Sequence, residues 1–128
     1  MGRILSLGTL AALGLASATP AAAQGMQKPA GAKRTVTGSV VDVSCKFGLG
    51  LSGADHRMCA QVCADKGITL AILGSDGKLY IPTTQAMPGE GQNARLKDFA
   101  EQEVRVSGTV FEAGGANAIW IDTIARKS

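Results

Sequence analysis

Alternating apolar and polar residues dominate the first half of the chain after its N-terminal segment. From Thr35 to Cys45 the residues are mostly β-branched and alternate in polarity, which is typical of a half-buried strand. Val36 belongs to one inward set, whereas Val41, Val43 and Cys45 form the next, so the register switches near Gly38. A glycine at such a switch predicts a β-bulge where the strand bends.

Two hairpins are predicted further along the chain. In each, two apolar runs flank a short segment whose glycine residues tolerate positive φ. The first hairpin pairs Ile68–Leu73 with Lys78–Ile81 over Ser75-Asp76-Gly77, and the second pairs Glu103–Phe111 with Asn117–Ile124 over Ala113-Gly114-Gly115. Together with the first run, these segments predict five strands.

Two helices fit between the strands, one at residues 54–66, ended by Gly67, and a short one at residues 94–100. Met58 and Val62 of the longer helix are expected to pack it onto the sheet. Five strands with a helix before the fourth predict a mainly β fold, a small OB-like Greek-key barrel, with the longer helix inserted after the first strand. Another small β-rich sandwich or an open barrel is the alternative.

The N-terminal segment has the pattern of a secretory signal peptide. Arg3 precedes an apolar run from Ile4 to Ala18, and small residues at 21–23 predict cleavage after Ala23. The run is too short for a convincing membrane span, so none is expected in the mature chain. We therefore predict a periplasmic or secreted protein with a signal peptide at 1–23, a flexible leader at 24–34 and one domain at 35–126.

The overall charge is mild. Lys and Arg number 13 against 10 Asp and Glu, a formal net charge of +3, and the two signs are mixed along the chain. Nucleic-acid binding is therefore not expected, and export argues against it as well.

The segments Val36–Cys45, His56–Cys63 and Val104–Val110 resemble those of small exported bacterial OB-like domains, a largely uncharacterised group. The resemblance covers most of the mature chain and implies the barrel fold. It implies no activity, because the group brings none with it.

The most informative chemistry is the crowding of all three cysteines and the single histidine between residues 45 and 63. On the predicted helix, His56, Cys59 and Cys63 stand at positions i, i+3 and i+7, so they share one stripe, and the glycine-rich connection allows the helix to fold back toward Cys45. Three thiolates and an imidazole complete a tetrahedral set for zinc, and the same soft ligands suit copper(I). Met58 adds a possible thioether ligand.

A disulfide is the competing interpretation, since export places the thiols in an oxidising compartment. Cys45 can bridge to Cys59 or to Cys63 and join the helix to the first strand. A mixed case has one disulfide, with the remaining cysteine and His56 binding copper or haem iron. Haem is the weaker choice, because a Cys-x-x-Cys-His motif for covalent attachment is absent from the sequence.

An enzyme is not expected. Cys59 and His56 resemble a nucleophile and its base, but the sequence names no third group that would orient them. Tyr80 and Trp120 are candidates for a ligand-binding face of the barrel, although lone aromatic residues in strands more often serve core or hairpin packing. The sequence thus predicts an exported metal-binding protein or, as the alternative, a disulfide-stapled module that binds an envelope protein, peptide or glycan.

Overall fold

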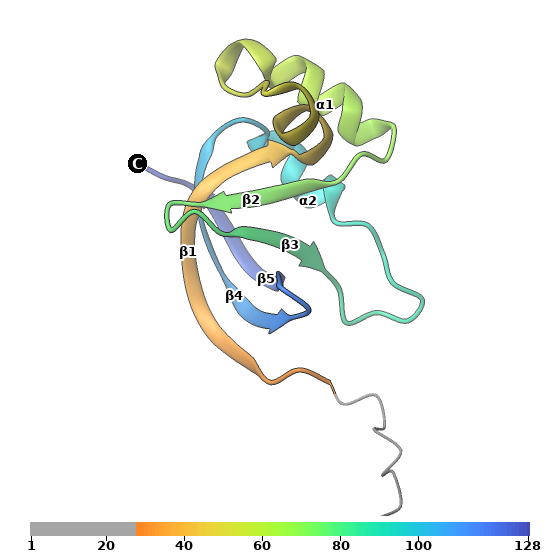
Figure 1. The fold of residues 1–128 in the computed structure, drawn as a ribbon, viewed down its shortest axis with the longest axis vertical. Helices are drawn as coiled ribbons and strands as arrows, with labels where there is room; N and C mark the ends of the chain where they lie inside the picture. The colour runs from red at the N-terminus through yellow and green to blue at the C-terminus, as the bar shows by residue number, and fades with distance from the viewer. Residues whose placement is uncertain (1–27) are drawn as a thin grey trace, which may run out of the picture.

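The computed structural model describes residues 28–128, which form a closed barrel of five strands (Figure 1). The strands neighbour one another in the order β1-β2-β3-β5-β4, and β4 closes the barrel by pairing with β1. All pairs are antiparallel except β3 with β5. The strands are β1 (Gly31–Asp42), β2 (Leu70–Gly74), β3 (Leu79–Thr83), β4 (Glu103–Ala113) and β5 (Ala116–Arg126). This mainly β, OB-like barrel and its two hairpins confirm the predicted fold class.

The long first strand holds the barrel together by pairing with two neighbours. Its first part pairs with β4 and its last part with β2, and at Gly38 and Ser39 it pairs with both. The predicted bulge at Gly38 is wrong, since the register is continuous there. The register shift lies instead between β4 and β5, where Ser107 and Gly108 pair with Thr123 and Ile121. Gly38 is instead required by close approach, because a Cβ there would lie 2.2 Å from the carbonyl oxygen of Leu73.

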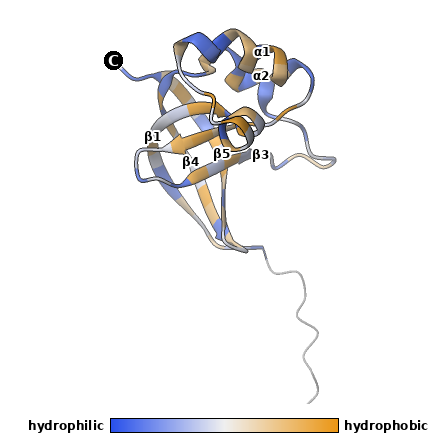
Figure 2. Cartoon of the chain, turned by 45° about the horizontal axis from the view of Figure 1, so that its top comes forward, coloured by the Kyte–Doolittle hydropathy of each residue, from blue (hydrophilic) through white to orange (hydrophobic). Residues whose placement is uncertain are grey.

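Inward-facing side chains from all five strands fill the barrel. Val36 and Val40 of β1 and Val104 and Val106 of β4 alternate with more exposed residues, as a strand with one face in the core requires. Burial of these apolar side chains is the main stabilising contribution to such a fold. Orange apolar segments accordingly follow the strands of the barrel (Figure 2).

Two helices cover the same end of the barrel (Figures 1 and 2). A 3-10 turn at Ala54–His56 leads into α1 (Arg57–Asp65), and α2 (Asn93–Leu96) continues into a 3-10 turn, η3 (Lys97–Phe99). The predicted helices are therefore present, and the one ahead of β4 is α-helical only in its first four residues.

The packing face of α1 differs from the expectation. Met58 and Val62 are 78% and 49% exposed, so the prediction that they pack the helix onto the sheet is wrong. Ala60 and Ala64 are buried instead. Small side chains let the helix lie close to the barrel, which burying Met58 and Val62 would prevent.

Both ends of β1 differ from the sequence boundaries. The strand begins at Gly31, so residues 31–34, which were predicted to belong to a flexible leader, pair with β4. It ends at Asp42, and Cys45 begins a π-helical turn, η1 (Cys45–Leu49), rather than ending the strand. The predicted signal peptide and the start of the leader lie outside the described residues. Among residues 28–128, no helix is long and apolar enough to cross a membrane.

Candidate metal centre

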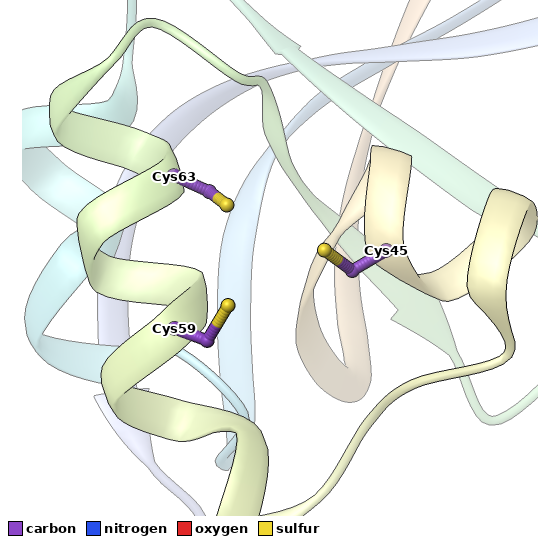
Figure 3. Close-up of side chains that lie close together, drawn as sticks. All are labelled: Cys45, Cys59 and Cys63. Atoms are coloured by element: carbon purple, nitrogen blue, oxygen red, sulfur yellow. The ribbon is translucent and has the colours of Figure 1, made fainter.

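Three thiols converge between η1 and α1. Cys45 lies at the start of η1, whereas Cys59 and Cys63 project from one face of α1, one helical turn apart. The three Sγ atoms all lie within 4.8 Å of one another. Figure 3 shows both helical thiols directed toward Cys45 across the gap between the two segments.

The thiols differ in their access to solvent. Cys45 is buried, Cys63 is half-buried and Cys59 is exposed, so the cluster opens to the surface at Cys59. All three cysteines of the chain belong to the described residues, and none is joined in a disulfide. The bridge predicted from Cys45 to Cys59 or Cys63 is therefore not formed in this structure.

The histidine predicted as a fourth ligand lies in a neighbouring group. A ligand atom of His56 lies within 4.8 Å of both Cys45 and Asp42, and these three residues form a second candidate set. His56 is not part of the set that contains Cys59 and Cys63. The four predicted ligands thus lie in one region but do not form one set of four. Cys45 belongs both to the three-cysteine set and to the set with Asp42 and His56.

Asp42 is the residue that sequence reasoning missed. It is the last residue of β1 and is completely buried, which is costly for a carboxylate without charged or hydrogen-bonding partners. The available signal was a carboxylate within the apolar run Val40-Val41-Asp42-Val43, three residues before Cys45.

The environment of Asp42 shows how the carboxylate is accommodated. Its Oδ1 accepts a 3.0 Å hydrogen bond from the backbone amide of Cys45. Burial acts to raise the pKa of Asp42, but this amide and the nearby thiols of Cys63 and Cys45 outweigh it, and the net pKa is lowered. Among the described residues, Oδ2 has no well-oriented hydrogen-bond partner.

The same carboxylate acts on the thiols. The proximity of the Asp42 carboxylate is the largest cause that raises the pKa of the Cys63 thiol to about 12, and burial adds to it. Burial first, and then Asp42, raises the pKa of Cys45. In the absence of a cation both thiols therefore stay protonated at neutral pH. Such thiols are poor nucleophiles, because the thiolate is the reactive form.

Polar contacts with the segment after α2 hold α1 in place. The Lys97 ammonium lies 2.6 Å from the Asp65 carboxylate at the end of α1, and Gln61 donates to the Lys97 carbonyl at 3.2 Å. Near the start of the helix, Arg57 donates to the carbonyl of Asp98 at 3.0 Å. These contacts fix the helix that carries two of the three thiols.

The remaining predicted site residues lie elsewhere or point outward. Tyr80 is 2% exposed within the barrel core and donates a 2.6 Å hydrogen bond to Asp76, so it presents no ligand-binding surface. Trp120 is half-buried, and its ring packs edge-on against Phe111 with centroids 4.4 Å apart. Met58 lies on α1 beside the cysteines, with most of its side chain in solvent.

Exposed apolar side chains gather on the segments that carry the thiols. Six large apolar side chains are exposed among residues 28–128, and all but one belong to residues 47–62. These five are Phe47, Leu49, Leu51, Met58 and Val62. Such a concentration on a small protein is typical of a contact surface.

No protein-family model, curated protein or solved structure matches this chain. The fold and the cluster of Cys, His and Asp side chains define a small OB-like barrel whose ligand atoms lie at distances compatible with metal binding. The chemistry of the site is therefore argued from its own geometry.

Proposed function

We propose that this chain is a small exported protein that binds a soft metal ion, copper(I) or zinc, through the thiolates of Cys45, Cys59 and Cys63. The observation that carries the proposal is the convergence of three free thiols from two segments within 4.8 Å. Two sulfurs on one tetrahedral zinc ion lie about 3.8 Å apart, given Zn–S bonds of about 2.3 Å. Small side-chain rotations bring the observed cluster to that spacing.

The thiol environment favours binding over catalysis. The raised pKa values of Cys45 and Cys63 disfavour thiolate in the free protein, whereas a bound cation reverses that preference. Metal uptake at neutral pH then releases protons, and affinity falls as the pH is lowered. The same raised pKa values argue against Cys45 and Cys63 as catalytic nucleophiles, because nucleophilic attack needs the thiolate.

The test counts metals and thiols on one sample. The chain is purified from the periplasmic or secreted fraction, its metal content is measured, and its thiols are alkylated before and after chelation and weighed by mass spectrometry. We expect bound copper or zinc, three thiols that alkylate only after chelation, and an N-terminus at Gln24. Cys59→Ser should weaken metal retention at least tenfold, whereas Val62→Ser, exposed on the same helix, should not.

A disulfide with one free thiol and no metal would contradict the proposal. That result would support the second candidate, a disulfide-stapled module that binds an envelope protein, peptide or glycan. The exposed apolar side chains at 47–62 favour a protein among these partners. In that case Phe47→Ser should reduce capture of the partner while leaving the thiol count unchanged.

A further inference from the structure

Two buried polar atoms beside the thiols lack hydrogen-bond partners within residues 28–128. They are Oδ2 of Asp42 and Nε2 of His56. Asp42 is 0% exposed and His56 8% exposed, so water gives neither side chain much compensation. Buried polar atoms nearly always have hydrogen-bond partners in native proteins, because an unsatisfied one is destabilising. Such a pair of orphaned ligand atoms points to a missing partner.

The two side chains share a neighbour with the thiol cluster. Their ligand atoms and Sγ of Cys45 all lie within 4.8 Å of one another, the same limit that defines the three-cysteine set. Cys45 therefore belongs to both sets. A thiolate that has bound one ion retains lone pairs, so its sulfur can bind a second.

We propose that Asp42, Cys45 and His56 form a second metal subsite for a divalent ion, with Cys45 as a thiolate that bridges it to the ion held by Cys59 and Cys63. The inference rests on the proposed function, since the first ion occupies the three-thiolate site. It explains both orphaned atoms, which become ligands, and it gives each ion three protein ligands. One position of each tetrahedron is left for water or an external ligand.

The charge of the cluster selects the ion. Three thiolates and one carboxylate carry four negative charges, which two divalent cations neutralise. A single divalent ion would leave two negative charges uncompensated in a largely buried site, at a high desolvation cost. The mixed carboxylate, imidazole and thiolate set of the second subsite suits zinc and is a poor match for copper(I), which prefers sulfur. The two-ion cluster is thus a zinc site.

Zinc stoichiometry tests this inference. The reduced full chain is titrated with zinc at neutral pH and weighed by native mass spectrometry, with circular dichroism to follow the fold. We expect two zinc ions per chain. One zinc ion that is unaffected by His56→Gln would overturn the second subsite and leave the proposed function intact. A chain that binds no zinc would overturn the second subsite, and one that binds neither zinc nor copper(I) would overturn the proposed function as well.

Variants assign each ion to its subsite. Asp42→Asn and His56→Gln should each reduce the stoichiometry to one zinc ion per chain. When cadmium replaces zinc, both variants should keep the cadmium–thiolate absorption of the three-cysteine site. Cys45→Ser should lower the affinity for both ions at least tenfold, because the sulfur of Cys45 binds both. Glu90→Gln, which changes an exposed carboxylate in the loop before α2, is the control, and this variant should still bind both ions. If Asp42→Asn does not fold, the wild-type count and His56→Gln decide the outcome alone.

Discussion

The side-chain amide of Asn93 donates a 2.7 Å hydrogen bond to the backbone carbonyl of Ile68. The same amide donates to the carbonyl of Ala64 at 3.0 Å, and its Oδ1 accepts from the amide of Leu70 at 3.0 Å. One side chain at the start of α2 thus joins the end of α1 to the start of β2. Since Cys63 directly precedes Ala64, Asn93 also supports the position of a proposed ligand.

Replacing Asn93 should therefore affect both the fold and the metal site. Asn93→Ala removes three hydrogen bonds and should lower the free energy of unfolding by about 2–3 kcal/mol, given about 1 kcal/mol per bond. Looser placement of α1 should also weaken metal binding, by about 10-fold. Denaturant unfolding and a metal-competition titration measure the two effects. Asn117→Ala, which loses a single 3.3 Å bond to the Leu79 carbonyl, is the control and should leave metal affinity unchanged.

The crossing of β1 between its two partners depends on Gly38. Because an added Cβ would lie 2.2 Å from the Leu73 carbonyl oxygen, Gly38→Ala forces β1 and β2 apart and should lower the free energy of unfolding by about 2–3 kcal/mol. Gly91→Ala is the control, since open space surrounds that position, and it should change stability little. Equal unfolding midpoints for the two variants would contradict the close approach.

The chain's only tyrosine, Tyr80, should titrate at a higher pH than a free tyrosine. Burial first, and then the hydrogen bond to Asp76, raises the pKa of Tyr80 from 10.0 to about 12. A folded-state pKa above the unfolded one means that stability is fully present below pH 10 and is lost as the pH rises toward 12. Tyrosinate absorbance, followed together with circular dichroism, should show a midpoint near 12, and a midpoint near 10 in the folded chain would contradict the burial.

The partner of Tyr80 gives the opposite dependence at low pH. The hydrogen bond from Tyr80 is the main cause that lowers the pKa of Asp76 below 3.8, so its contribution to stability is lost as the pH falls below that value. Tyr80→Phe should lower the free energy of unfolding by about 1–2 kcal/mol at neutral pH. It should also weaken the pH dependence of stability at both ends of the range. Thermal unfolding across the pH range compares the variant with the native chain.

Local patterns in the sequence were sufficient to predict the strands. The two hairpins are predicted by the alternation of apolar and polar residues and by the turns at Asp76-Gly77 and Gly114-Gly115. Together with the long first run, the hairpins predict the barrel. Helical spacing likewise placed Cys59 and Cys63 on one face of α1. These features depend on residues close in sequence, so a single chain is enough to predict them.

The composition of the site depended on contacts between distant segments. The sequence grouped His56 with all three cysteines, but only the tertiary structure added Asp42 and placed His56 in a set with Cys45 and not with Cys59 and Cys63. The exposure of Met58 was likewise decided by the tertiary structure. In the tertiary structure β1 ends at Asp42, and the carboxylate of this residue is buried beside the thiols. A period in the sequence tells which side chains share a face of one element. Which elements meet, and which polar atoms are left without partners between them, follows from packing over the whole barrel.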